Sequence, residues 1–211
     1  FIVQDVCQSI YYEGNIDYII NAAGQASPKF YGKDPVGTIE GHILGTDNCL
    51  RLAVEKHVRG FLYFSSCDVY GTEPEENIID EHYVGRVDTL SERSCYPVGK
   101  LAAESLCAAY KMQYNVPVRI MRIAHTYGPL MPLNDGRVFA DFVSNILRNE
   151  DIALNSDGSA ERPMLYISDA VRAYFRILLQ GETGEAYNVV SDEQISILDL
   201  AKTLVDLCLN K

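Results

Sequence analysis

Apolar segments rich in β-branched and aromatic residues alternate along the chain with longer segments of helical periodicity. The segments 18–20 and 61–64 are apolar without interruption, which is typical of strands covered on both faces. This alternation predicts βαβ units and a mostly parallel, doubly wound α/β sheet, with ligands at the carboxyl ends of its strands. The predicted strands are 1–3, 17–22, 60–64, 118–123, 152–154 and 186–189, and the predicted helices are 36–57, 97–114, 139–149, 168–179 and 196–209.

Two polar segments interrupt the alternation, and we expect them to be long surface loops. The first, 71–91, is acidic, and the second, 128–137, is rich in proline, asparagine and glycine. Long loops in α/β domains often carry function. The elements become shorter after about residue 151. We therefore expect residues 1–150 to form the main sheet domain and residues 151–211 to belong to a smaller lobe.

The composition narrows the class of protein. The chain has 211 residues, of which 47% are hydrophobic and 22% are charged, so one full hydrophobic core is expected. No apolar run approaches the roughly 20 residues of a membrane span, so we expect no insertion into a membrane. The formal net charge of −11 disfavours general binding to nucleic acid, because an acidic surface repels phosphates.

The 6 cysteines form neither CxxC pairs nor the Cys/His spacing of a zinc site, so we expect no metal. No secretory signal precedes the first apolar run, and a chain of this length folds without disulfides. We therefore expect reduced thiols and a cytoplasmic location.

The segment from Tyr96 to Lys100 is the strongest candidate for chemistry. These two residues are four apart at the predicted start of a helix, so their side chains share one face, and Pro97 suits the first turn. An ammonium near a phenol favours the phenolate, so we expect a lowered pKa for Tyr96. Tyr96 would then act as acid or base toward a hydroxyl whose carbon exchanges hydride. By itself, the YxxxK pattern is also compatible with a solvated helix N-terminus.

Ser66 is the second candidate, because it follows the buried run 61–64 and is expected at the carboxyl end of a strand. Its hydroxyl could bind a substrate oxygen there, or it could satisfy backbone groups in a turn. A serine, a tyrosine and a lysine in this order, each just past a strand, form a more specific pattern than any one alone.

Several sequence motifs occur along the chain: Asn21-Ala22-Ala23-Gly24, Ser65-Ser66-x-x-Val69-Tyr70-Gly71, Arg93-x-Cys95-Tyr96-x-x-Gly99-Lys100, Arg122-x4-Tyr127-Gly128-Pro129, Asn134-Asp135-Gly136-Arg137-Val138, and Arg162 seven residues before the aspartate of Tyr166-Ile167-Ser168-Asp169. Together these motifs resemble the extended short-chain dehydrogenase/reductase family, which contains NAD-dependent nucleotide-sugar epimerases, dehydratases and decarboxylases. The resemblance covers essentially the whole chain and is greatest to the UDP-glucuronate decarboxylases. It implies a Rossmann-like NAD-binding domain and a smaller substrate-binding lobe.

The resemblance also implies roles for single residues. Tyr96 would remove the proton of the sugar 4-hydroxyl, Lys100 would hold the nicotinamide ribose, and Ser66 would share the hydroxyl proton. Asp68 would be a further catalytic carboxylate. Hydride transfer from C4 to NAD would leave a transient 4-keto sugar, before decarboxylation, elimination or rotation. The implied NAD contacts are Asp5, at the adenine, with Val6, Ala22, Ala23, Gly24, Tyr96, Lys100 and Ile123, and the implied nucleotide-sugar contacts are Arg93, His125, Arg137 and Arg162.

The chain departs from the family pattern at its start. No GxxGxxG motif occurs among its 15 glycines, and the chain opens directly in a strand-like run. The family's first βα units, which hold the pyrophosphate, are therefore expected to precede Phe1. On this interpretation the stretch alone would bind NAD poorly and would be inactive.

Two further departures concern the substrate. Cys67-Asp68 replaces the Asp-Glu pair of the dehydratases, and cysteine is a poor acid at neutral pH, which disfavours dehydration. Asp68 is also one methylene shorter than the glutamate of the decarboxylases, a change that can displace a catalytic carboxylate. His125 replaces an asparagine, either as a changed specificity contact or as a structural histidine.

Three functions stay open. UDP-glucuronate decarboxylation is the favoured reaction, whereas a nucleotide-sugar 4-epimerase would need only Ser66, Tyr96 and Lys100. A non-catalytic regulatory relative that binds a nucleotide would tolerate the changes at Cys67, Asp68 and His125. The resemblance also implies a homodimer formed through the helices 36–57 and 97–114.

Overall fold

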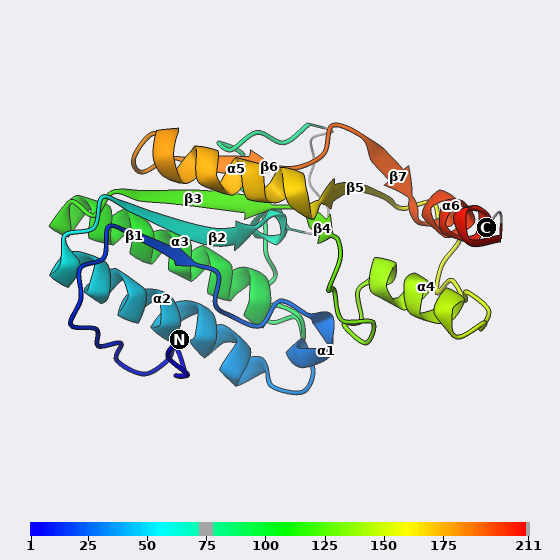
Figure 1. Cartoon of the computed structure of the whole chain (residues 1–211), viewed down its shortest axis with the longest axis horizontal. Coiled ribbons are helices and arrows are strands. Elements are labelled where there is room, and N and C mark those ends of the chain that lie inside the picture. The colour runs from blue at the N-terminus through cyan, green and yellow to red at the C-terminus, as the bar shows by residue number, and fades with distance from the viewer. Residues whose placement is uncertain (72–77, 210–211) are drawn as a thin grey trace.

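The computed structural model describes residues 1–71 and 78–209 (Figure 1). Its main sheet has four strands, and all neighbouring strands are parallel. This confirms the predicted parallel α/β sheet. In spatial order the strands are β1 (Tyr18–Asn21), β2 (Gly60–Ser66), β3 (Val118–Ile123) and β6 (Ala186–Val189).

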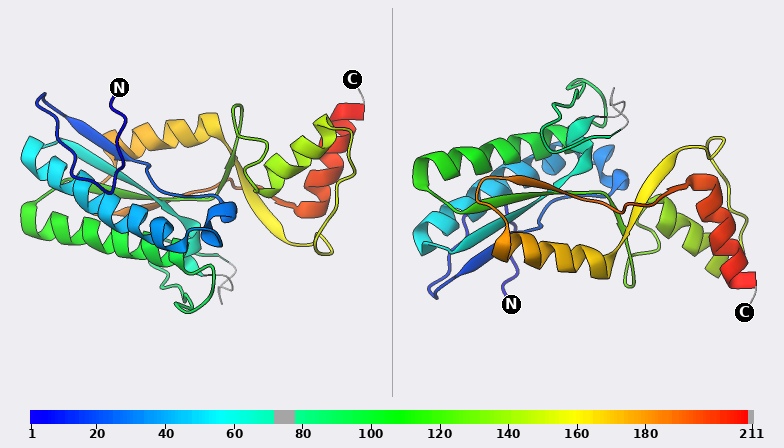
Figure 2. Two further views of the ribbon diagram at one scale, coloured as in Figure 1. Left: turned by 90° about the horizontal axis from the view of Figure 1, so that it is seen from below. Right: turned by 90° about the horizontal axis from the view of Figure 1, so that it is seen from above.

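Helices cover both faces of this sheet. α2 (Pro35–Lys56) and α3 (Cys95–Tyr114) lie side by side on one face, and α5 (Ile167–Gln180) lies on the other (Figures 1 and 2). β2 shows the cause, because successive side chains of a strand point to opposite faces. Phe61 and Tyr63 pack into the core beneath α2 and α3, whereas Leu62 packs with α5. An uninterrupted apolar strand is therefore what two-sided coverage requires.

Capping interactions define the boundaries of the two long helices, α2 and α3. The Asp34 carboxylate accepts a hydrogen bond of 2.9 Å from the Gly37 backbone N–H, which caps the start of α2. His57 and Asn115 follow α2 and α3 in left-handed conformation, with φ of 51° and 58°. These boundaries place the first turn of α3 at the carboxyl end of the sheet.

A smaller lobe adjoins that end of the sheet (Figure 2). It contains β4 (His125–Tyr127), β5 (Glu161–Tyr166) and β7 (Gln194–Ser196), and β5 pairs parallel with β4 and antiparallel with β7. Phe142, Leu200 and Ala201 form the core between α4 (Val138–Leu147) and α6 (Ile197–Leu209). The division of the chain at residue 150 stays a prediction.

Two predicted strands are wrong. Residues 1–3 are exposed coil, because a strand needs a neighbouring backbone and β1 pairs only with β2 among the described residues. Residues 152–154 are also coil, and Ile152 and Leu154 pack instead against the core of the smaller lobe. Strands β4, β5 and β7, the short helix α1 (Pro28–Tyr31) and the 3-10 turn η1 (Cys67–Tyr70) were not predicted.

The expected surface loop at 71–91 falls partly on residues 72–77, which lie outside the described residues. Within 1–71 and 78–209, no helix is both long and apolar enough to cross a membrane.

Candidate active site

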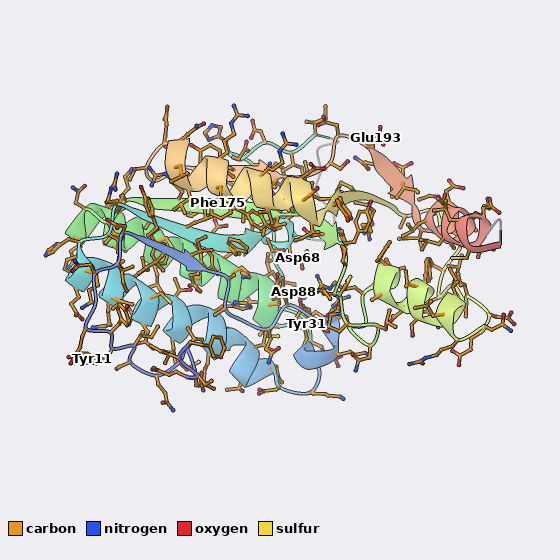
Figure 3. All side chains as sticks on the ribbon, in the orientation of Figure 1. Tyr11, Tyr31, Asp68, Asp88, Phe175 and Glu193 are labelled. Carbon is orange, nitrogen blue, oxygen red and sulfur yellow. The ribbon has the colours of Figure 1, made fainter. Side chains whose placement is uncertain are left out.

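The candidate site lies where the main sheet meets the smaller lobe. Ser66 is the last residue of β2 and is in register with Ile123, the last residue of β3. Tyr96 lies in the first turn of α3 at the same end. Figure 3 shows Tyr31 and Asp68 at this end of the sheet as well.

Tyr96 is buried among other rings. The ring of Tyr31 stacks on it, with centroids 5.1 Å apart and planes inclined by 21°, and His42 meets it edge-on at 5.3 Å. Burial raises the pKa of Tyr96 to about 12, although a hydrogen bond with the Ser66 hydroxyl lowers it. The expected lowering of this pKa by Lys100 is therefore wrong for the protein without ligands, because desolvation outweighs it.

Lys100 lies one turn further along α3 and is 5% exposed. Its ammonium donates a hydrogen bond of 2.6 Å to the Phe64 carbonyl and lies 5.7 Å from the Tyr96 ring centroid. Burial lowers the pKa of Lys100 to about 8, while Glu104 raises it. The two residues thus lie close together, but the ammonium binds the backbone of β2.

His42 is a site residue that no sequence pattern singled out. It is 0% exposed and fits between two glycines: an added Cβ would lie 2.4 Å from its Cε1 at Gly24 and 3.1 Å from its Cδ2 at Gly99. Its Nε2 lies 3.2 Å from the Gln25 carbonyl, and its Nδ1 has no partner among the described residues. Burial lowers the pKa of His42 to about 4, so the ring is neutral at pH 7.

The segment after Ser66 turns sharply. The Ser66 hydroxyl accepts a hydrogen bond of 3.2 Å from the Asp68 backbone N–H, and the Asp68 side chain is exposed. The Cys67 thiol lies 3.7 Å from the Arg122 carbonyl, and burial raises its pKa to about 12. Cys67 is therefore protonated at neutral pH and is no replacement for a catalytic carboxyl.

The four residues expected to contact the nucleotide-sugar lie in two places. Arg93 and Arg137 lie near the stacked rings of Tyr31 and Tyr96, and Arg162 and Arg137 lie near His125. The Arg93 guanidinium lies 6.0 Å from the Tyr31 ring centroid, and the charge of Arg137 lowers the pKa of Tyr96. The pKa of His125, on β4, is lowered first by desolvation and then by the charges of Arg162 and Arg137, while the charge of Asp68 raises it. The charge of Arg137 therefore acts on both Tyr96 and His125.

The loop that carries Arg137 is tied to the segment around α1. The Ser27 hydroxyl donates a hydrogen bond to the Asp135 carbonyl, and the Lys29 ammonium donates one to the Asn134 carbonyl. Arg137 in turn forms an ion pair with the Asp135 carboxylate. These contacts hold Arg137 beside the two stacked tyrosines.

Most of the residues expected to contact NAD lie at the carboxyl ends of β1 and β3. Ala22, Ala23 and Gly24 follow β1 and are exposed, and Ile123 is half-buried beside Ser66. Asp5 and Val6 are placed differently: Asp5 accepts a hydrogen bond from the Cys7 backbone, and the Asn48 side chain on α2 binds the Val6 carbonyl at 2.9 Å. No strand leads into Asp5 and Val6, because residues 1–3 are coil.

A model of the NAD dependent epimerase/dehydratase family matches residues 3–190. The chain belongs to this family. UDP-glucuronic acid decarboxylase 6 of Arabidopsis thaliana is 36% identical over 203 residues, which cover 96% of this chain and 58% of that protein. UDP-glucuronic acid decarboxylase 4 of the same plant is 40% identical over 200 residues, covering 95% of this chain and 44% of that protein. The chain thus spans roughly half the length of these relatives.

Comparison with solved structures confirms the predicted Rossmann-like fold of this chain. UDP-glucuronic acid 4-epimerase from Bacillus cereus, solved with NAD, superposes with a TM-score of 0.80 at 26% identity, covering 90% of this chain and 58% of that one. UDP-glucose 4-epimerase from Thermotoga maritima, solved with UDP-glucose, gives a TM-score of 0.84 at 23% identity, covering 91% and 61%.

Proposed function

We propose that the protein containing this chain is an NAD-dependent enzyme that modifies a nucleotide-sugar through a transient 4-keto intermediate, with decarboxylation of UDP-glucuronate as its reaction. The proposal depends chiefly on the convergence of Ser66, Tyr96 and Lys100 at the carboxyl end of the sheet. The identity of 36% and 40% to UDP-glucuronic acid decarboxylases favours this reaction over other family chemistries.

The described residues fit the nicotinamide end of a dinucleotide. Gly24 has a φ of +132° and leaves its backbone exposed after β1, where a Cβ would collide with His42. We assign Lys100 and Tyr96 to the nicotinamide ribose, and Ala22, Ala23 and Ile123 to further cofactor contacts. When bound, NAD supplies a cationic ring that accepts hydride from the sugar carbon and returns it. No residue of this sequence supplies the glycine-rich turn that holds a pyrophosphate.

Tyr96 and Ser66 handle the proton in this proposal. With a pKa of about 12, Tyr96 holds its proton at neutral pH in the protein without ligands. To take the proton of the sugar 4-hydroxyl, Tyr96 must first release its own proton, and the hydrogen bond with the Ser66 hydroxyl stabilises the resulting phenolate. Lys100, with a pKa of about 8, is mostly an ammonium at pH 7 and stabilises negative charge that develops on the phenol. Positioned acid–base groups of this kind contribute about 10²- to 10⁴-fold to turnover.

The remaining predicted residues bind the substrate in this proposal. The guanidinium groups of Arg93, Arg137 and Arg162 suit the paired oxygens of a diphosphate. They also explain how a chain of net charge −11 can bind an anionic ligand. We assign the exposed carboxylate of Asp68 to the reacting sugar and His125 to the specificity contact.

The test uses the full-length protein with UDP-glucuronate and NAD, followed by mass analysis and chromatography of the products. A product lighter by one carbon dioxide supports decarboxylation. A product of unchanged mass but altered retention would replace decarboxylation by 4-epimerisation, which needs only Ser66, Tyr96 and Lys100. Absence of any product with several UDP- and dTDP-sugars would reject the enzymatic proposal.

A regulatory protein that binds a nucleotide without turnover is the second candidate. It is favoured by the protonated thiol of Cys67, which stands where the dehydratases place an acid. Calorimetry with the nucleotide-sugar, followed by mass analysis of the recovered ligand, separates the two candidates, because a regulator would bind the nucleotide-sugar and leave it chemically intact.

We further propose a homodimer formed through α2 and α3. These helices lie side by side and expose Leu44 and Met112, which are 44% and 84% accessible. Light scattering on the full-length protein tests the homodimer, and a strict monomer would reject it.

We also propose a cytoplasmic location. All six cysteines are free thiols in the structure, which supports this proposal.

A further inference from the structure

Glu104, on α3, is a buried carboxylate with three hydrogen bonds. Its Oε1 accepts one of 2.5 Å from the Ser65 hydroxyl and one of 3.1 Å from Arg122 Nε, and its Oε2 accepts one of 2.8 Å from Arg122 Nη2. The side chain is 10% exposed. We call Ser65, Glu104 and Arg122 the Glu104 cluster. Its paired geometry with Arg122 fixes the carboxylate in one orientation.

The Glu104 cluster adjoins the candidate site along both α3 and β2. Glu104 follows Lys100 by one helical turn, so both side chains lie on the same face of α3. Ser65 precedes Ser66 on β2 and is in register with Arg122 on β3. The cluster therefore joins α3 to the two strand ends that carry the site.

The surroundings of Lys100 make this position important. Its ammonium faces the Tyr96 ring from its own helix, the Tyr63 ring from β2 at 5.1 Å, and the Phe64 carbonyl. His42, on α2, is neutral at pH 7 but lies within range of the Lys100 charge. Glu104 is the carboxylate that favours the charged form of Lys100, whereas burial disfavours it.

We propose that Glu104 is a positioning residue for the reaction: held by Ser65 and Arg122 one helical turn from Lys100, its carboxylate keeps the Lys100 amine charged beside Tyr96. This inference rests on the proposed function of Lys100 and Tyr96. A purely structural ion pair would stabilise α3 against β3 but would leave the titration of Lys100 unchanged. The two possibilities therefore differ in a measurable quantity.

The decisive measurement is the titration of Lys100 by NMR in the full-length protein labelled at the lysine side chains, with Lys100→Arg to assign the signal. In Glu104→Gln we expect the pKa of Lys100 to fall by about 1 pH unit or more, because a nearby opposite charge shifts a pKa by about 1–3 units. Glu150→Gln removes an exposed carboxylate elsewhere and should leave the titration unchanged. A folded Glu104→Gln protein with the original Lys100 titration would overturn the proposal.

Turnover provides a second readout. In Glu104→Gln the alkaline limb of the kcat profile should move to lower pH by the same amount as the Lys100 titration, and Glu104→Asp should restore part of it. If Glu104→Gln does not fold, Ser65→Ala decides, since it removes one hydrogen bond and keeps every charge. We expect it to lower kcat by about 3- to 10-fold with little change in KM, as for loss of one buried hydrogen bond; a kcat within twofold of the original would overturn the proposal.

Failure of the proposed function gives a different result. If the unaltered protein shows no turnover of nucleotide-sugars, yet Glu104→Gln still shifts the Lys100 titration, the enzymatic proposal fails. The electrostatic link between Glu104 and Lys100 then stands.

Discussion

The ring of Tyr31 stacks on the ring of Tyr96, and both tyrosines are almost completely buried. Tyr31 ends α1, a helix of 4 residues, and its hydroxyl lies 3.3 Å from the Ala26 carbonyl. A short segment after β1 therefore forms one wall of the candidate site. This arrangement fixes the plane of the phenol that we assign to proton transfer.

Replacing Tyr31 tests this wall. Tyr31→Leu should lower the free energy of unfolding by about 1–3 kcal/mol, because it removes an aromatic pair and leaves space beside Tyr96. It should also reduce kcat, since the Tyr96 ring is freed. Tyr31→Phe keeps the stack and should stay close to the original in urea unfolding and in turnover. Equal behaviour of the two variants would contradict a role for the stacked ring.

Tyr96→Phe should reduce kcat by about 10²- to 10⁴-fold and leave the affinity for the nucleotide-sugar within a few-fold, because only the proton-transferring hydroxyl is lost. Calorimetry and steady-state kinetics on the full-length protein measure the two effects. Tyr114→Phe, at a tyrosine that is 51% exposed, is the matched control. Turnover that survives Tyr96→Phe would assign the proton transfer to another group.

His42 makes the stability depend on pH. Its pKa is about 4 in the folded protein and 6.5 in the unfolded chain, so the unfolded chain binds more protons between these values. Stability should therefore fall as the pH drops through this window, by about 2 kcal/mol between pH 7 and pH 5. Urea unfolding of His42→Gln at both pH values should show that much less loss. A variant that loses as much as the original would place the acid sensitivity elsewhere.

Two glycines in adjacent helices provide a matched pair. A Cβ at Gly99 would lie 3.1 Å from His42 Cδ2, so Gly99→Ala should displace the His42 ring and cost about 1–3 kcal/mol. A Cβ at Gly41 would meet only the Gly24 Cα, at 3.9 Å. Gly41→Ala should therefore be neutral or stabilise the protein by up to about 1 kcal/mol. Thermal unfolding measures both, and equal stabilities would show that His42 can move without cost.

Elements could be predicted from the sequence where the spacing of apolar residues matches the faces that the fold buries. The apolar run at 61–64 became the centre of β2, with Phe61 and Leu62 buried on opposite faces. β5 was missed because Pro163 lies within it, and proline disfavours the middle of a sheet. In the structure Pro163 is the third of the 6 residues of β5 and pairs with Gln194 of β7, whereas the pairing with β4 begins at Met164. β7 itself has 3 residues, too few to show a period.

Ser66, Tyr96 and Lys100 could be predicted because each follows a strand or starts a helix within a recognisable spacing. Tyr31, His42 and Glu104 could not, because their roles depend on contacts across the fold. The i+4 spacing of Lys100 and Glu104 was the available signal for Glu104. The wrong expectation for the Tyr96 pKa has the same origin, since the degree of desolvation is set by Tyr31 and His42.

Ser27 and Lys29 bind the carbonyls of Asp135 and Asn134, and so join the loop that carries Arg137 to the opposite side of the site. To swing outward, this loop must break both hydrogen bonds, at a net cost of about 1–3 kcal/mol. The displaced conformer would then be populated at roughly one molecule in five to one in two hundred. In most molecules, an incoming diphosphate would thus meet an Arg137 that is already held in place. Exchange of the ligand would depend on the small fraction of molecules in which the loop is displaced.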